Sequence, residues 1–205
     1  MQYRELTIPG AFEITPRQFG DPRGVFLEWF KSPAFEQAVG HPLALEQANC
    51  SVSSAGVVRG IHFADVPPGQ AKYVTCARGA VLDVVVDIRV GSPTFGQWDS
   101  VLLDDVERRA IYLGEGLGHA FMALEDDSTV LYLCSTGYDP AREHGINPLD
   151  TAIGLEWPTS DRHGNPVTPL LSEKDTGAAT LAEAAEQGLL PTYEEVQAYV
   201  ASLAG

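Results

Sequence analysis

The sequence predicts an all-β fold, a sandwich or barrel of short strands with a few short helices around it. Between residues 45 and 134, apolar and β-branched runs alternate with segments rich in Gly, Pro and Asp. This regular spacing of strands and turns is typical of sandwiches and barrels. The length of 205 residues, with 44% hydrophobic and 20% charged residues, suits one globular domain. We therefore expect residues 1–205 to form a single domain.

The N-terminal segment, residues 1–30, is expected to form an extended arm. Its stretch 20–24 is rich in turn-forming residues and leads into an aromatic strand at residues 25–30. A short helix should follow, because Ser32 precedes a proline as an N-cap does and Gly40 provides a stop.

Alternation of side chains along the expected strands assigns polar groups to faces. In the strand at residues 72–76, Lys72 shares a face with Val74. Tyr132 lies on one face of its strand with apolar neighbours. The strongest strand, residues 81–88, carries Asp83 and Asp87 on one face.

The C-terminal part of the chain is irregular at first and then predicts two helices within residues 180–205. Each begins with a Thr-x-x-Glu capping box, Thr180 with Glu183 and Thr192 with Glu195. We expect both helices to pack on the outside of the β core and to carry no chemistry.

The composition excludes several classes of function. A formal net charge of −15 argues against nucleic-acid binding, which needs a basic surface. No apolar run reaches membrane-spanning length and no signal pattern opens the chain, so we expect a cytoplasmic protein without membrane association. The cysteines Cys50, Cys76 and Cys134 form no Cys-x-x-Cys pair, and the last two are expected to be buried thiols in a reducing compartment.

The most informative stretch is Arg59-Gly60-Ile61-His62-Phe63, followed closely by Lys72. A guanidinium, an imidazole and an ammonium group are embedded here in apolar β sequence, where a charge is costly unless it is paired or used. Each residue alone has a structural explanation, as a strand-end arginine, a core histidine or a rim lysine. Together they favour a site. The chain is acidic and has only three lysines, so an anion would need a local cluster of positive charge. Arg23, Arg59 and Lys72 are the candidates for this cluster.

Simple alternation places Arg59 and His62 on opposite faces of one strand. Gly60 lies between them and is a natural position for a β-bulge. We predict that such a bulge brings both side chains to the same face.

These residue types are suited to proton transfer next to a carbonyl group. A histidine serves as general base near neutral pH, a lysine stabilises a developing oxyanion, and a tyrosine from a neighbouring strand donates a proton. The chain contains no Gly-x-Ser-x-Gly, no phosphate loop and no Gly-x-Gly-x-x-Gly after a strand. A metal centre is the main alternative: the five histidines are isolated in sequence, but His62 and His119 could meet in space with a carboxylate.

Several motifs follow one another in a characteristic order: RGIHF at 59–63, QAK at 70–72, DVVVDIR at 83–89, GSPTFG at 91–96 and LSEKD at 171–175. Together they resemble the dTDP-4-dehydrorhamnose 3,5-epimerase family, from Ile8 to Asp175. The resemblance implies a double-stranded β-helix, a cupin-like jelly roll, that forms a homodimer and uses no metal or other cofactor. The implied substrate is a dTDP-linked 4-keto-6-deoxyhexose.

The resemblance also implies roles for individual residues. His62 would be the base, Asp175 would orient it, Lys72 would stabilise the enolate oxygen, and Tyr132 would be the acid on the opposite side. The residues that would hold the nucleotide, diphosphate or sugar are Arg23, Glu28, Gln47, Asn49, Arg59, His119, Tyr138 and Glu143. Some of these binding residues would come from the partner chain, whose N-terminal arm would lie at the dimer interface.

One departure from the family pattern bears on the reaction. The family often has Ala-His-Gly-Phe where this chain has Gly118-His119-Ala120-Phe121. With the segments around Tyr138 and Asn147, it resembles members that make deoxysugars for glycosylated natural products such as antibiotics. We therefore expect inversion at C5 alone, with inversion at both C5 and C3 as the alternative.

The alternatives are the full 3,5-epimerase of dTDP-L-rhamnose synthesis, a non-catalytic sugar-binding cupin, and a metal-dependent cupin. A non-catalytic cupin would have no need to keep His62, Lys72 and Tyr132 together, and all three are present.

Overall fold

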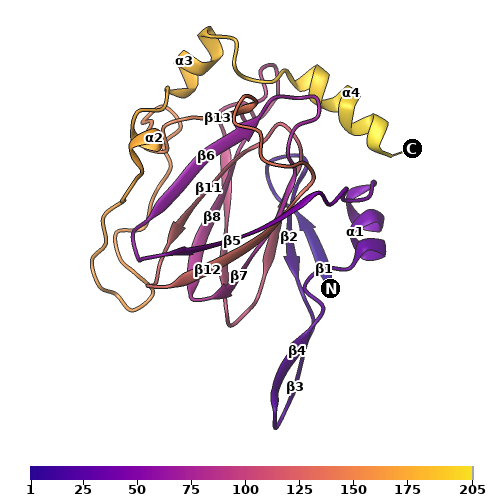
Figure 1. The fold of residues 1–205 in the computed structure, drawn as a ribbon, viewed down its shortest axis with the longest axis vertical. Helices are drawn as coiled ribbons and strands as arrows, with labels where there is room; N and C mark the ends of the chain where they lie inside the picture. Colours follow the sequence, from indigo (N-terminus) through magenta and orange to yellow (C-terminus); the bar gives the residue numbers. More distant parts are fainter. Residues whose placement is uncertain (205) are drawn as a thin grey trace.

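Two antiparallel β-sheets packed face to face form the body of the protein in a computed structural model that describes residues 1–204 (Figure 1). The six-stranded sheet has the order β1 (Gln2–Glu5), β2 (Ala11–Thr15), β10 (Ala110–Leu113), β7 (Lys72–Arg78), β12 (Ser128–Cys134), β5 (Gln47–Ser53). The five-stranded sheet has the order β13 (Glu143–Gly145), β6 (Val58–Ala64), β11 (Gly118–Ala123), β8 (Ala80–Val86), β9 (Trp98–Asp104). The predicted double-stranded β-helix, a cupin-like jelly roll, is confirmed.

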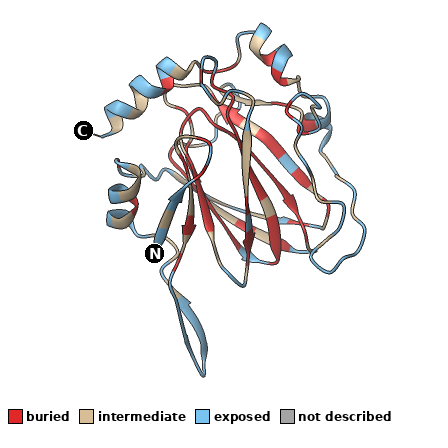
Figure 2. Ribbon diagram, turned by 180° about the vertical axis from the view of Figure 1, so that it is seen from behind, coloured by how far each residue is buried: buried red, intermediate tan, exposed pale blue. Residues whose placement is uncertain are grey.

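The main core lies between the two sheets. Val74 and Val130 of the six-stranded sheet meet Val85 and Phe121 of the five-stranded sheet in one buried cluster. Figure 2 shows the buried positions running along the strands of both sheets. This arrangement follows from alternation, since every second side chain of a strand faces the opposite sheet.

The peripheral helices are α1 (Ser32–Val39), α2 (Glu173–Thr176), α3 (Leu181–Glu186) and α4 (Tyr193–Leu203). Both predicted capping boxes are present, at Thr180 and Thr192. The helix at 32–39 ends at Gly40 as predicted, with φ +97°, but its N-cap is Lys31 and Ser32 is already helical. The side chain of Lys31 makes no capping hydrogen bond, so Pro33 in the first turn is the remaining local start signal.

The C-terminal helices cover the β core, as the sequence predicts. Leu181 of α3 is buried in a cluster with Ile61 and Val84 of the five-stranded sheet. Val196 of α4 is buried as well, and a Cβ atom at Gly116 would lie only 2.5 Å from its side chain. None of the helices within residues 1–204 has the length and hydrophobicity that a membrane crossing requires.

The prediction of an extended arm over residues 1–30 is wrong for its first half. β1 and β2 are part of the six-stranded sheet, because β2 pairs with β10. Only the hairpin of β3 (Gln18–Asp21) and β4 (Gly24–Leu27) projects from the body, at the foot of Figure 1. β4 ends before the predicted limit of residue 30, and the hairpin exposes Phe19 and Phe26.

The predicted strand 81–88 also ends earlier, at Val86. Asp87 lies beyond β8 and accepts hydrogen bonds from Arg89, Ser92 and Thr94. It therefore organises the turn after the strand, while Asp83 remains within the sheet.

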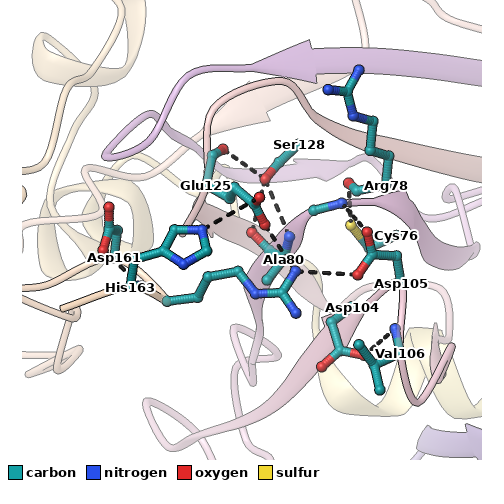
Figure 3. A network of polar contacts seen from close by, with 12 residues as sticks. Cys76, Arg78, Ala80, Asp104, Asp105, Val106, Glu125, Ser128, Asp161 and His163 are labelled. Atoms are coloured by element: carbon teal, nitrogen blue, oxygen red, sulfur yellow. Dashed lines mark hydrogen bonds and ion pairs between the residues drawn. The ribbon is translucent and has the colours of Figure 1, made fainter. Parts of the chain in front are cut away.

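One end of the β sandwich is closed by a polar network at the turns that follow β7, β9 and β11 (Figure 3). Arg162 donates to Asp105 at 3.1 Å and to Glu125 at 2.8 Å. Ser128 donates to the backbone oxygens of Ala80 and Glu125. Lys72 begins β7 and so lies at the far end of that strand.

Candidate active site

A cavity of about 450 Å³ opens between the two sheets and contains most of the residues that the sequence predicted. All four predicted catalytic residues line it: His62, Lys72, Tyr132 and Asp175. The predicted binding residues that line it are Gln47, Asn49, Arg59, His119, Tyr138 and Glu143. The fold thus brings together side chains from strands that are distant in sequence.

A β-bulge at Gly60 accounts for the presence of both Arg59 and His62 in this cavity. β6 pairs with β11 through His62 opposite His119 and Arg59 opposite Phe121, so β6 has one residue more than β11 across the same interval. Gly60 has φ +108°, and a Cβ atom there would lie 2.3 Å from the backbone oxygen of His119. Only glycine fits this position, and the predicted bulge is confirmed.

His62 is paired with Asp175 at the cavity wall. Nε2 of His62 lies 2.7 Å from Oδ1 of Asp175, with the histidine side chain 36% exposed and the aspartate 7% exposed. Ser172 caps α2 and donates to the other carboxylate oxygen at 2.9 Å. Burial by itself would raise the pKa of Asp175, but hydrogen bonds from His62 and Ser172 outweigh it and hold this pKa below the ordinary value. An ionised Asp175 only accepts, so it takes Nε2–H and leaves Nδ1 of neutral His62 able to receive a proton.

A second histidine–aspartate pair, His119 with Asp83, lies deeper. Nε2 of His119 lies 2.9 Å from Oδ1 of Asp83, and the two side chains are 10% and 0% exposed. Burial raises the pKa of Asp83, against the opposing effects of His119 and Lys72. Asp83 was predicted only as a strand residue; an acid inside an otherwise apolar strand was the signal for a buried partner.

Lys72 and Tyr132 come from the six-stranded sheet, opposite His62. Tyr132 pairs with Val74 and Cys134 with Lys72, so the lysine and the tyrosine lie on adjacent strands and the same face. Burial lowers the pKa of Lys72, although Cys134, Glu143 and Asp83 act in the other direction. Burial raises the pKa of Tyr132, which keeps the phenol protonated near neutral pH. An imidazole and a phenol thus occupy opposite walls, with an ammonium group beside the phenol.

Hydrogen bonds fix several polar groups around this cavity before any ligand arrives. Gln47 donates to Asn49 at 2.8 Å and accepts from the backbone N–H of Tyr138 at 2.9 Å. Arg59 donates to Ser53 at 3.1 Å. Preorganised donors of this kind reduce the ordering cost of binding a polar ligand.

Further lining residues were not predicted as site residues: Val57, Val58, Gln70, Phe121, His144, Leu170, Leu171, Ser172 and Lys174. Gln70 donates to Glu143 at 3.2 Å, and Nε2 of His144 lies 2.7 Å from Oδ1 of Asp65. Lys174 directly precedes Asp175 in the LSEKD motif, so this motif could have identified it as a site residue. It adds a second ammonium group to the cavity.

Arg23 and Glu28 do not line the cavity of their own chain. Arg23 lies in the turn of the projecting hairpin and pairs with Asp21. Glu28 follows β4 and lies 3.3 Å from the ammonium group of Lys31. Both are exposed.

The exchanged small residues Gly118 and Ala120 face away from the cavity. Ala120 is buried in the outer cluster with Ile61, and a Cβ atom at Gly118 would lie 2.7 Å from the same side chain. Their neighbours His119 and Phe121 line the cavity instead. The exchanged residues are therefore not part of the cavity lining.

His62 and His119 are cross-strand neighbours, but each is paired with its own aspartate. Within residues 1–204 there is no group of three or more His, Cys, Asp or Glu side chains arranged to hold a metal ion. The three cysteines are free thiols; Cys76 and Cys134 are buried as predicted, and Cys50 is exposed.

Comparison with known proteins places the chain among sugar-nucleotide epimerases. The family model for dTDP-4-dehydrorhamnose 3,5-epimerase matches residues 5–183. A dTDP-4-dehydrorhamnose 3-epimerase from Streptomyces niveus is 60% identical over 97% of this chain and 92% of its own length. A dTDP-4-dehydrorhamnose 3,5-epimerase from Mycolicibacterium smegmatis is 59% identical over 99% and 97%.

Solved structures agree with these sequence comparisons. The rmlC epimerase of Mycobacterium tuberculosis superposes with a TM-score of 0.95 at 53% identity, covering 99% of this chain and 100% of that one. ChmJ, a 3′-monoepimerase from Streptomyces bikiniensis in complex with dTDP-quinovose, superposes with a TM-score of 0.92 at 50% identity, covering 97% and 98%.

Proposed function

The chain belongs to the dTDP-4-dehydrorhamnose 3,5-epimerase family and is an isomerase of dTDP-linked 4-keto-6-deoxyhexoses, and from this premise we propose which of its residues perform each step. The observation that carries the proposal is the position of His62 on one wall of a single cavity, with Lys72 and Tyr132 on the opposite wall. Epimerisation needs this two-sided arrangement, because a proton leaves one face of the sugar ring and another arrives on the other face.

The C4 ketone acidifies the hydrogen atoms on C3 and C5. Nδ1 of His62 removes one of these protons, and the electron pair moves to the C4 oxygen as an enolate. The ammonium group of Lys72 stabilises this oxyanion, and the phenol of Tyr132 returns a proton to the opposite face. His62 ends as imidazolium, stabilised by Asp175, and Tyr132 as phenolate; proton exchange with water restores both.

We propose that both centres, C5 and C3, are inverted. The exchanged small residues Gly118 and Ala120, one of the features that favoured restriction to C5, face away from the cavity. The relatives include 3,5-epimerases at 59% and 53% identity, and those named for one centre are 3-epimerases. A product made for a glycosylated natural product and one made for dTDP-L-rhamnose are both compatible with this chemistry.

The diphosphate is the anionic part of the substrate, and Arg59 and Lys174 offer positive charge in the cavity. Arg23 and Glu28 support a homodimer in which each hairpin reaches the cavity of the other subunit. They lie outside the cavity of their own chain, on a projecting hairpin that exposes Phe19 and Phe26. Exposed aromatic side chains on such an extension are suited to an interface.

Incubation with dTDP-4-keto-6-deoxyglucose in D₂O, followed by NMR, tests the reaction. We expect deuterium at C5 and at C3. Deuterium at one carbon only would restrict the reaction to that centre. Absence of exchange at both carbons, with dTDP still bound, would contradict the proposed catalytic roles.

Mixing two inactive variants tests the shared site. If Arg23 serves the partner's cavity, an Arg23→Ala subunit and a His62→Ala subunit form a mixed dimer with one intact cavity. Random pairing then restores roughly a quarter of the wild-type sites. The control is a mixture of His62→Ala with Lys72→Ala, which stays inactive because each loss falls in the cavity of its own chain, so neither cavity of a mixed dimer is intact. No recovery in the first mixture would contradict the exchange of hairpins.

A further inference from the structure

We propose that Gln70 is a positioning residue for the epimerisation, which holds the carboxylate of Glu143 apart from the ammonium group of Lys72. This inference rests on the role proposed above for Lys72, the stabilisation of the enolate oxygen. Gln70 lines the catalytic cavity and lies two residues before Lys72, just ahead of β7. It is therefore placed to act on the lysine through a third group.

The side-chain amide of Gln70 uses both of its donors. Nε2 donates to Oε1 of Glu143 and to the backbone oxygen of Thr136, each at 3.2 Å. Both partners are oxygen atoms that only accept, so the amide nitrogen and not its oxygen faces them. Gln70 thus links the carboxylate at the start of β13 to the segment that follows β12.

The backbone on either side of Gln70 is tied to the same segment. Oγ1 of Thr136 donates to the backbone oxygen of Gly69 at 2.8 Å. The backbone N–H of Ala71 donates to Oγ of Ser135 at 2.8 Å, and the backbone N–H of Ser135 donates to the oxygen of Ala71 at 3.0 Å. These bonds fix the amide of Gln70 in place before a ligand arrives. They also do not depend on the Gln70 side chain, so a substitution there leaves this framework intact.

Glu143 and Lys72 influence each other without forming an ion pair. The charge of Glu143 is one of those that act on Lys72, together with Cys134 and Asp83. Within residues 1–204, the ammonium group of Lys72 makes no hydrogen bond or salt bridge, so its three donors remain for a ligand. In the same part of the chain, Gln70 is the one side chain that donates to the Glu143 carboxylate.

An ion pair between these two groups would work against the reaction. Negative charge develops on the enolate oxygen, and Lys72 stabilises it best when no other anion shares the ammonium group. Lys72 is only 9% exposed, and poor screening at a buried site strengthens the attraction of a nearby carboxylate. The amide of Gln70 carries no charge and gives Glu143 a different partner. It thereby leaves the ammonium group to the enolate.

Gln70→Met tests the proposal, because it keeps the length of the side chain and removes both donors. Glu143 is then free to pair with Lys72, and we expect kcat for deuterium exchange to fall by about tenfold. The alkaline decline of the rate should move to higher pH, because an adjacent carboxylate raises the pKa of an amine. The other groups that act on Lys72, Cys134 and Asp83, are unchanged in this variant. A loss of packing alone would lower the rate at every pH and leave the alkaline decline in place.

The double variant Gln70→Met/Glu143→Gln isolates the effect of the carboxylate. A neutral amide at position 143 cannot offset the charge of Lys72, so adding Gln70→Met to Glu143→Gln should change kcat by less than about twofold. Gln47→Met is the matched control. Gln47 lines the same cavity and accepts from the backbone N–H of Tyr138. Its loss should raise KM without moving the alkaline decline.

The inference is overturned if the alkaline decline of Gln70→Met stays at the wild-type pH or moves lower. It is also overturned if Gln70→Met costs as much kcat in the Glu143→Gln background as in the wild type. Failure of the proposed function is distinguishable through Lys72→Met. Full activity of that variant would remove the role of the lysine, whereas an inactive Lys72→Met with a wild-type profile in Gln70→Met would remove only the role of Gln70.

Discussion

Two histidine–aspartate pairs lie on neighbouring strands at the catalytic cavity and differ mainly in burial. His62 and His119 are cross-strand neighbours, and their contacts with Asp175 and Asp83 are 2.7 and 2.9 Å long. The first pair reaches the cavity with a partly exposed imidazole, whereas the second is almost completely buried. The pKa of Asp175 is lowered by its hydrogen bonds against the effect of burial, and the pKa of Asp83 is raised by burial.

The difference indicates that the same two residue types at the same separation can serve different purposes. A carboxylate held ionised next to an accessible imidazole is equipped to support proton removal, because it stabilises the imidazolium that forms. A fully buried pair cannot exchange protons with substrate and water as readily. The pair of His119 and Asp83 is instead suited to holding a ligand group and to acting on the charge of Lys72.

Replacing each histidine in turn is the most direct test of whether the two pairs have different roles. His62→Ala removes the base, so we expect deuterium exchange at C3 and C5 to fall by about 10³-fold or more while dTDP binding is retained. His119→Asn should raise KM and leave exchange measurable. Single-turnover NMR and dTDP titration separate the two effects. Equal losses of kcat in both variants would mean that the pairs do not differ in role.

Lys72→Met tests the ammonium group on the wall opposite His62. Removal of the oxyanion-stabilising ammonium group should lower kcat by about 10²- to 10³-fold. Lys174→Met is the matched control, since Lys174 lines the same cavity and should affect KM more than kcat. Steady-state kinetics distinguish these outcomes. If Lys174→Met reduces kcat as strongly as Lys72→Met, the assignment of Lys72 to the enolate oxygen fails.

Asp175→Asn tests whether the charge of Asp175 supports proton removal by His62. The amide still accepts a hydrogen bond from His62 but no longer stabilises an imidazolium, so we expect exchange to slow by about 10- to 100-fold. The lowered pKa of Asp175 also contributes stability above the ordinary carboxyl pKa of about 3.9, and this contribution is lost as pH falls through the folded pKa. Denaturant unfolding of both proteins should therefore differ at neutral pH and converge in acid. A constant difference would contradict this.

Parts of the catalytic cavity could be predicted from local signals, whereas Asp175 and most of the binding residues were assigned through the resemblance to the epimerase family. Gly60 between two polar residues of an apolar strand indicated the bulge, and alternation assigned Lys72 and Tyr132 to defined faces. The capping boxes at Thr180 and Thr192 fixed the helix starts in the same way. In each case the physical cause lies within a few residues of the effect.

What could not be predicted depends on pairing between distant segments. The pair of Asp83 and His119 follows from the register of β8 with β11. The prediction of an N-terminal arm failed at β1 and β2, because β2 pairs with β10, which lies far along the chain. The side on which Ala120 lies was likewise set by the packing of the outer cluster. A single sequence carries no direct record of such long-range contacts.

Asp83→Asn tests the buried pair through its effect on Lys72. Burial lowers the pKa of Lys72, and the charge of Asp83 is one of the groups that oppose this. Without that charge, the pKa of Lys72 should fall further, so the ammonium group is lost at a lower pH. Activity requires the protonated lysine, and the alkaline decline of the exchange rate should therefore begin at lower pH than in the wild type. At lower pH the rate should stay within a few-fold of wild type.

Asp175→Asn is the control for that profile. Asp175 is not among the charged groups that act on Lys72, so its replacement should lower the rate at every pH without moving the alkaline decline. Lys72→Arg provides a second check: the guanidinium stays charged, so whatever activity remains should lose the alkaline decline. An alkaline profile in Asp83→Asn that coincides with the wild type would mean that the buried pair does not support the charge of Lys72. The two pairs would then differ in burial alone, because the deeper carboxylate would have no measurable influence on the chemistry.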